Sequence, residues 1–409
     1  MTLESSGVRP RLHGLDAVRG LAFLATVTFH AALSFLPGPQ IWVTRDTPDM
    51  GIADFFVVSH MSHMLIFFVL AGFFARMTIE RRGIGPFARD RLLRITLPGI
   101  VFWPFIIAGV IATFIGGAIV MHGAGATSAP PPPTGFSASA FPLTHLWFLY
   151  ALTLTYAGAL AFVGLGKLLD RKGRMRARVY DPAMRWLTAN RLLVPVLALP
   201  MAALFLSSPA WLPTMGIPTP DHGFLPNIIA TRSYALAFLL GWLLQRQPAL
   251  LDMIRRDGFG YCLAAGIASV LLLLQVKPEL FLAPGRAFAH PAYLALLYAV
   301  AAWCWTLGLI GAGMRLLNEE HPVVRYVSDA SYWIYITHLP VVMAMQVLVY
   351  RLPAPALIKF GMATGGSLLI LFASYHLLVR HSWVGAWLNG RKVPWGGARA
   401  IETLEAATA

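Results

Sequence analysis

Two ionisable residues, Arg19 and His30, lie eleven positions apart within one apolar segment near the start of the chain. At about 100° per residue, an α-helix places both side chains on nearly the same face, roughly 16 Å apart along its axis. Such a pair suits a long ligand whose anionic end binds the arginine and whose reactive end meets the histidine. The alternative is a snorkelling arginine and a hydrogen-bonded structural histidine, and the pair alone does not choose between them.

Further histidines are expected at the depth of His30. His60 and His63 open the second apolar segment, and His145 opens the fourth at the same expected end. Histidines scattered by chance would fall at all depths, whereas these four share one level. Since ionisable groups inside apolar segments usually face a cavity, the four together indicate a site.

A later apolar segment adds polar side chains. His338 lies about midway along it, beside Tyr332 and Tyr335. We expect His338 to reach the same cavity as the other histidines. His376, near the other end of its segment, is interpreted as structural.

Arginines gather at the opposite expected end of the segments. Arg91 and Arg94 are spaced i and i+3, which places them on one helical face. Two guanidinium groups can share one anion, so we interpret this pair as a phosphate clamp. Asp16 precedes Arg19 by three residues and either orients it or caps the first helix. The sequence thus predicts anion binding at one end and histidine chemistry nearer the other.

The composition fixes the fold class that must position these residues. Of 409 residues, 57% are hydrophobic and 12% charged, with a mean hydropathy of +0.65. Soluble proteins carry about 25% charged residues, so an ordinary soluble protein is excluded. The pattern predicts an all-α, polytopic transmembrane bundle of about ten spans. The expected spans cover residues 14–36, 55–77, 95–120, 144–166, 190–208, 226–246, 258–276, 290–316, 327–349 and 355–379. The fifth is the weakest, because it is short and contains Pro195 and Pro200.

The basic residues predict the orientation. Of the lysines and arginines between the expected spans and in the tails, 25 lie in the two tails and the even-numbered loops and five in the odd-numbered loops. By the positive-inside rule, both termini are expected in the cytoplasm. The net charge of +14 is therefore interpreted as a topology signal, and no nucleic-acid partner is expected. Cys262 and Cys304 lie inside apolar segments and predict neither a disulfide framework nor a metal site.

The first span, GLDAVRGLAFLATVTFH, resembles the opening signature of the membrane-bound acyltransferase-3 family, in which an arginine or lysine, ten residues and then the catalytic histidine follow each other. Three further segments resemble family motifs in the same order: IFFVLAGFF (66–74), RLLRITLP (91–98) and SYWIYITHLP (331–340). The combination of HMSHMLIFFV (60–69) with HLWFL (145–149) is most similar to the branch that succinylates osmoregulated periplasmic glucans.

The resemblance implies an activity and a location. The family takes an acyl group from a cytoplasmic thioester, such as acetyl- or succinyl-coenzyme A, and transfers it to a carbohydrate hydroxyl outside the cytoplasmic membrane. We therefore expect a multi-pass enzyme of the bacterial inner membrane, surrounded by membrane lipids, with acyl-coenzyme A as co-substrate and no tightly bound cofactor. The oligomeric state stays open. Residues 1–380 are expected to form the acyltransferase domain and residues 381–409 a cytoplasmic tail.

The resemblance also assigns roles. Arg19, Arg91 and Arg94 would bind the phosphates of the donor, while its thioester reaches His30. His30 would be the general base or a transient acyl carrier, and the sequence leaves both open. Asp16 would assist by orienting Arg19. The acceptor side is expected to comprise His63, His145, Trp147, Tyr332 and His338, with Trp147 stacking on a sugar ring.

Two other functions compete. A transporter or flippase for a small anionic or glycolipid substrate would also need a polar path with arginines inside and histidines outside. The chain shows no internal repeat to support that class. A structural membrane scaffold would tolerate Arg19→Ala and His30→Ala, whereas an acyltransferase would lose transfer.

Overall fold

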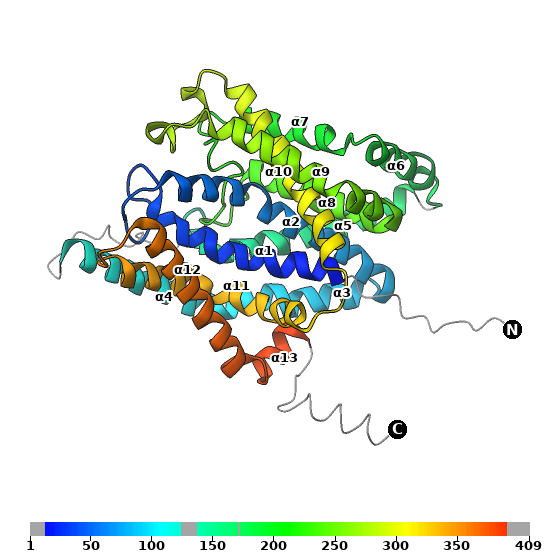
Figure 1. The fold of residues 1–409 in the computed structure, drawn as a ribbon. Helices are drawn as coiled ribbons and strands as arrows, with labels where there is room; N and C mark the ends of the chain where they lie inside the picture. Colours follow the sequence, from blue (N-terminus) through cyan, green and yellow to red (C-terminus); the bar gives the residue numbers. More distant parts are fainter. Residues whose placement is uncertain (1–12, 124–136, 171, 391–409) are drawn as a thin grey trace.

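The computed structural model describes residues 13–123, 137–170 and 172–390, and these fold almost entirely into helices (Figure 1). The α-helices are α1 (His13–Ala32), α2 (Met50–Arg82), α3 (Ile84–Arg91), α4 (Leu97–His122), α5 (Trp147–Leu169), α6 (Asp181–Ala189), α7 (Leu193–Leu206), α8 (Ile228–Arg246), α9 (Pro248–Leu273), α10 (Pro291–Leu316), α11 (Pro322–Val349), α12 (Ala356–Ser374) and α13 (Trp383–Asn389). The one β-bridge in these ranges joins Pro142 to His222. The all-α prediction is confirmed.

Nine spans in the described ranges are long and apolar enough to cross a membrane, and a bent pair makes a tenth if it counts as one span. The pair joins residues Arg176–Ala189 to α7 at an angle of 100°. α7 alone has 14 residues, or about 21 Å, which is short of a hydrocarbon core of about 30 Å. The expected fifth span, 190–208, is therefore the one that does not form a single helix long enough to cross a membrane, and several other spans start at other residues than expected. The cytoplasmic location of both termini stays a prediction.

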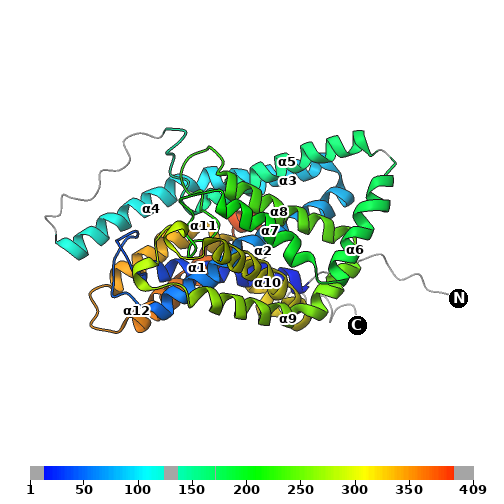
Figure 2. The same ribbon diagram turned by 90° about the horizontal axis from the view of Figure 1, so that it is seen from above.

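The central helices are those that carry the predicted site. α1, α2 and α10 are the most buried spans, whereas α4, α5 and α12 expose most of their surface. Figure 2 shows α4 and α5 along one edge of the bundle and α9 and α12 along the other, with α1 and α2 between them. α1 packs against α2, α10, α11 and α12, so its polar face looks into protein.

Close helix crossings hold this centre together. A Cβ atom on Gly241 of α8 would lie 1.8 Å from the carbonyl oxygen of Val69, and one on Gly72 of α2 would lie 2.0 Å from that of Phe238. Only glycine permits this approach of two backbones, which is how membrane helices gain van der Waals contact where lipid removes the hydrophobic drive. The crossing fixes α2, and with it His60 and His63.

The C-terminal part of the described chain returns to the bundle. Trp387 of α13 donates from Nε1 to the carbonyl oxygen of Leu93 at 2.8 Å, and Asn389 donates from Nδ2 to that of Asp329 at 3.0 Å. The expected tail, residues 381–409, thus begins with a packed short helix. Residues 391–409 lie outside the described part of the chain.

Candidate functional site

Three histidines from three elements meet in the bundle. His30 ends α1, His145 lies in the short 3₁₀ turn Thr144–Leu146 before α5, and His338 is near the middle of α11. Nε2 of His338 lies 3.2 Å from Nδ1 of His30, and the His145 and His338 rings are 4.7 Å apart. His338, which the sequence placed beside this cavity, is fully buried at the centre of the group. We call His30, His145 and His338 the histidine cluster.

Backbone carbonyl groups set the proton positions in the cluster. Nδ1 of His338 lies 2.7 Å from the carbonyl oxygen of Tyr335, and Nδ1 of His30 lies 2.9 Å from that of Thr26. Because a carbonyl oxygen only accepts, the nitrogen facing it carries the hydrogen in a neutral ring. The single Nδ1–H of His30 is then shared between two acceptors, the Thr26 carbonyl oxygen at 2.9 Å and Nε2 of His338 at 3.2 Å. This assignment leaves the lone pair of His30 on Nε2.

Nε2 of His30 is the atom placed for proton transfer. His30 is half-buried, and Nε2 takes no hydrogen bond from another residue in the described ranges. His145 adds a second acceptor: its Nε2 donates to the carbonyl oxygen of Ile336 at 2.9 Å, while its buried Nδ1 has no partner among the described residues. Two neutral acceptors beside each other are suited to a substrate hydroxyl, which must be oriented and then deprotonated.

His60 and His63 join the cluster through an aromatic ring. Phe29 stacks on His60 with centroids 5.2 Å apart and lies 5.1 Å from His63. Nδ1 of His63 donates to the carbonyl oxygen of Ser59 at 2.9 Å. The sequence placed both histidines at the start of the second helix, but α2 begins at Met50, where Asp49 caps it, so they lie inside the span. His60 and His63 thus lie around Phe29, next to His30, as their expected shared depth requires, whereas the expected start of the second helix is wrong.

Trp42, an aromatic residue that the sequence did not single out, lies beside His30. The Trp42 ring lies 6.0 Å from the His30 ring, and its Nε1 donates to Oε1 of Gln346 at 2.8 Å. The Gln346 amide in turn donates to the carbonyl oxygens of His30 at 3.1 Å and Ala31 at 2.9 Å. A glutamine within an apolar span is the signal that was available, because a buried amide needs partners.

A buried ion pair anchors the loop that carries Trp42. Nζ of Lys359 lies 3.1 Å from each carboxylate oxygen of Asp46, with the two side chains 8% and 4% exposed. Lys359 also donates to the carbonyl oxygen of Tyr350 at 2.8 Å. The pair joins the loop between α1 and α2 to α12, and so holds Trp42 over His30.

Trp147 lies elsewhere. Its ring is 6% exposed and stacks on Tyr234 of α8 with centroids 5.6 Å apart. No described side-chain contact joins its indole ring to the histidine cluster, whereas the ring of Trp42 lies beside His30.

The predicted phosphate-binding arginines lie beside carboxylates. Arg19 is 3.1 Å from Asp16, and Asp90 lies 3.2 Å from Arg94 and 3.6 Å from Arg91. The side chains of Arg19 and Arg94 are 37% and 39% exposed, and that of Arg91 is 24% exposed. We call Arg19, Arg91 and Arg94 the arginine group. An entering anion would share these guanidinium groups with Asp16 and Asp90, the latter of which sequence analysis did not single out.

A π-helical turn, Leu92–Thr96, positions the second half of the arginine group. Its wider i→i+5 pattern leaves carbonyl groups available, as at many functional π-bulges. Tyr332 of α11 donates to the carbonyl oxygen of Arg94 at 2.6 Å, and Trp387 donates from Nε1 to the carbonyl oxygen of Leu93. Arg91 extends over the ring of Tyr156 at 5.5 Å. Tyr332, expected on the acceptor side, therefore lies at the arginine group.

One face of α11 connects the two groups. Tyr332, Tyr335 and His338 are spaced by three residues, with ring centroids 6.5 Å and then 6.0 Å apart. Tyr335 also donates to the carbonyl oxygen of His145 at 2.6 Å. α11 thus runs as a polar and aromatic rib from the arginine group to the histidine cluster.

Metal chemistry has no ligand set in the described residues. Within residues 13–123, 137–170 and 172–390, no group of three or more His, Cys, Asp or Glu side chains is arranged to hold a metal ion. The site as described offers bases, hydrogen-bond donors and cations.

Known proteins resemble the chain along most of its length. A family model of the acyltransferase-3 type, described as acyltransferase domain, matches residues 12–376. The chain is 26% identical over 345 residues to proteins named Glucans biosynthesis protein C from Salmonella paratyphi B, Salmonella agona and Salmonella dublin. Each alignment covers 82% of this chain and 83% of the relative. No solved structure matches the chain.

Proposed function

Because the chain belongs to the acyltransferase-3 family, we propose that it is a membrane O-acyltransferase that moves a succinyl or acetyl group from acyl-coenzyme A to a hydroxyl group of a glucan or related carbohydrate. The arginine group would face the cytoplasm, where the donor is, and the histidine cluster would lie toward the acceptor. The name of the Salmonella relatives supports a glucan acceptor, and the sequence resemblance favours succinyl as the transferred group.

The observation that carries this proposal is the arrangement of the two ring nitrogens of His30. Nδ1 faces the Thr26 carbonyl oxygen and His338, and Nε2 has no hydrogen-bond partner among the described residues. In the direct route, Nε2 accepts the proton of the acceptor hydroxyl while the hydroxyl oxygen forms the ester bond to the thioester carbonyl carbon. The carbon–sulfur bond breaks, and the leaving thiolate takes the proton from the His30 imidazolium. In the carrier route, Nε2 attacks the thioester carbonyl carbon, the carbon–sulfur bond breaks and coenzyme A leaves as the thiolate. The acceptor hydroxyl then attacks the acyl-imidazolium, its proton passes to the thiolate, and the carbon–nitrogen bond breaks to restore neutral His30.

The spacing along α1 supports binding of the donor at both ends. Arg19 and His30 are separated by about 16 Å along the helix, which is of the order of a phosphopantetheine arm. The phosphates would bind the arginine group in competition with Asp16 and Asp90. Charge-assisted hydrogen bonds from two or three guanidinium groups would hold them.

The acceptor would lie against Trp42. An indole face provides an apolar platform for a sugar ring, and Gln346 fixes its orientation through Nε1. His145, with its unpartnered Nδ1, would accept a hydrogen bond from a neighbouring hydroxyl group. His63 of α2 would help to position the acceptor.

The experiment that tests the proposal measures donor binding and turnover separately. Purified full-length protein is offered acetyl- and succinyl-coenzyme A, with wild type, His30→Ala and Arg19→Ala in parallel. We expect wild type to bind and turn over one thioester, Arg19→Ala to bind it more weakly, and His30→Ala to bind it without turnover. His376→Ala is the matched control, because His376 lies beside Tyr326 and outside both groups.

The proposal fails if folded wild-type protein binds neither thioester. Flux of anions or glycolipids through liposomes would then test the transporter instead. Full thioester turnover in both Arg19→Ala and His30→Ala would contradict the roles proposed for these two residues.

A further inference from the structure

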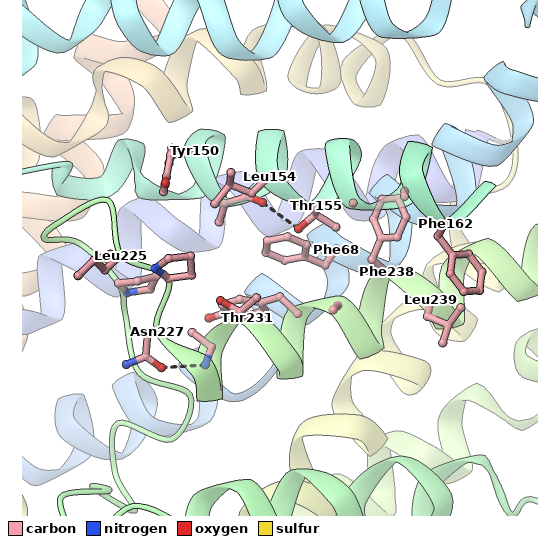
Figure 3. Close-up of a pocket in the computed structure, with 18 of the residues that line it drawn as sticks. Phe68, Tyr150, Leu154, Thr155, Phe162, Leu225, Asn227, Thr231, Phe238 and Leu239 are labelled. Carbon is pink, nitrogen blue, oxygen red and sulfur yellow. Dashed lines mark hydrogen bonds between the residues drawn. The ribbon is translucent and has the colours of Figure 1, made fainter. Parts of the chain in front are cut away.

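A cavity lies away from the histidine cluster, between α5 and α8. It is a groove of about 440 Å³, shown in Figure 3 with its lining side chains. Residues Tyr150 to Phe162 of α5 form one wall, and Ala230 to Trp242 of α8 form the other. The rings of Phe68 and Tyr234, stacked 4.5 Å apart, are at the back.

The groove has the length of one membrane leaflet. Twelve residues separate Tyr150 from Phe162, and at 1.5 Å per residue the α5 wall is about 18 Å long. Half of a hydrocarbon core of about 30 Å is roughly 15 Å. Since α5 and α8 are both spans, the long direction of the groove follows the direction of a lipid chain.

The groove opens sideways toward the bilayer, and its two ends differ in polarity. Leu225, Phe162 and Leu239 at its rim are 74%, 64% and 41% exposed. In Figure 3, Tyr150 and Asn227 lie at one end, and Phe162 and Leu239 at the other. The polar end is that of His145, five residues before Tyr150 in the chain. Arg232 directly follows Thr231 of the lining, is exposed on α8 and carries a positive charge.

Small residues keep the groove open. Gly158 lies on its α5 wall, where a Cβ atom would have no neighbour within 4 Å. Ala235 faces it from α8 and is exposed. The lining between the two ends is mostly apolar, with the side chains of Thr155 and Thr231 as exceptions, so the groove suits hydrocarbon better than water.

We propose that this groove binds one acyl chain of a phospholipid from the leaflet at the histidine end, with its phosphate near Arg232. The leaflet length, the side opening and the difference in polarity between the two ends together favour a phospholipid over a longer polyisoprenyl chain. Lipid binding itself does not depend on the proposed acyl transfer.

The bound chain would support the wall of the candidate site. Phe68 contacts Phe148 at 5.4 Å between centroids, and Phe148 contacts Tyr335 at 5.6 Å. Tyr335 holds the His145 backbone. Because Phe68 also lines the groove, a bound chain would pack against the first ring of this aromatic series.

The test uses a phospholipid with a photoactivatable group in its acyl chain, added to the purified full-length protein. Peptides of α5 and α8 should carry label well above other lipid-facing peptides. Gly158→Leu should reduce that labelling several-fold and remove the thermal stabilisation that added phospholipid gives wild type. Gly266→Leu is the matched control, because Gly266 also lies on a span with no neighbour within 4 Å of a Cβ, but on α9.

A second filling variant, Ala235→Leu, keeps the test decisive if Gly158→Leu does not fold. Equal labelling of all lipid-facing peptides, or labelling unchanged in both filling variants, would overturn the proposal. Displacement of the label by a polyisoprenyl phosphate but not by unlabelled phospholipid would also overturn the phospholipid assignment.

Discussion

The two ends of the α1–α11 pair are built by opposite means. At the arginine group, charged side chains are partly exposed and lie beside Asp16 and Asp90. At the histidine cluster, neutral rings are buried or half-buried and are fixed by backbone carbonyl groups. The first arrangement suits exchange of one anion for another, and the second suits a base that keeps one tautomer.

The arginine group and the histidine cluster differ in burial, and burial sets the free-energy cost of changing a partner at each. An exposed ion pair contributes about 0–1 kcal/mol, so a ligand phosphate can replace a carboxylate at little cost. A buried polar group left without a partner costs about 1–3 kcal/mol, so the rings of the histidine cluster keep theirs. Five predictions test this contrast, beginning with the largest expected effect.

Replacing His30 by alanine should have the largest effect on activity. Loss of a positioned general base lowers kcat by about 10²–10⁴-fold. The donor dissociation constant should stay unchanged, because the phosphates bind at the other end. Steady-state kinetics with a separate binding titration checks this, and a kcat within a factor of two of wild type would contradict it.

The ion pair between Lys359 and Asp46 should matter for stability far more than that between Arg19 and Asp16. Lys359→Met leaves a buried carboxylate unpaired, which costs about 3–5 kcal/mol. Thermal or denaturant unfolding in detergent measures it. Adding Asp46→Leu should recover most of the loss, and if Lys359→Met is as stable as wild type, burial does not distinguish the two pairs.

His338 acts through His30 as a positioning residue. His338→Phe removes one of the two acceptors for the Nδ1–H of His30 and leaves the Thr26 carbonyl oxygen, and we expect kcat to fall by about tenfold, within the usual cost of one lost orienting hydrogen bond. The donor KM should hold. His338→Gln, which can still accept, should restore part of kcat. A change in KM alone would show that His338 has another role.

At the arginine group, Arg91→Ala should raise the donor KM by about tenfold and leave kcat nearly constant, because a charge-assisted contact of about 1.5–3 kcal/mol is lost. Wild-type affinity should also weaken with added salt, as expected of exposed charges. Arg89→Ala provides a nearby control without a described ion pair. Equal effects of both substitutions would argue for general surface charge.

The smallest effect is expected from Asp90→Asn. The amide keeps the shape of the side chain but removes the negative charge that competes with a ligand phosphate, so donor affinity should rise by about two- to threefold at low salt, of the order of one exposed ion pair. Titration of the donor at two salt concentrations measures it. Weaker binding would mean that Asp90 orients the arginines more than it competes with the ligand.

The spans were largely predictable because hydropathy and loop charge depend on local sequence. The exception, the region of α6 and α7, bends at Arg191, whose backbone is left-handed with φ of 57° and whose side chain pairs with Asp257 of α9. No local pattern predicts a bend that depends on a partner 66 positions away. Start positions were also inexact, as for α2.

The candidate site was predictable where one helix or one motif carries it. Arg19 and His30 share α1, and the contact of His338 with His30 agrees with its expected depth. Trp42 was missed because Gln346, its partner, is 304 residues away. Trp147 was chosen for its neighbour His145, but adjacent residues on a helix point in different directions, and the indole packs on α8.

The packing of α1 against α10, α11 and α12 has a consequence for biosynthesis. His30 and His338 are 308 positions apart, so at 5–20 residues per second the ribosome needs about 15–60 s to supply the partner. During that time the first span carries the Arg19 guanidinium group in the bilayer without its later neighbours, and an unpaired charge inside a membrane span is costly. Asp16, on the same helix as Arg19, is made at once, so this intrahelical pair shields the newly inserted span until its late neighbours arrive.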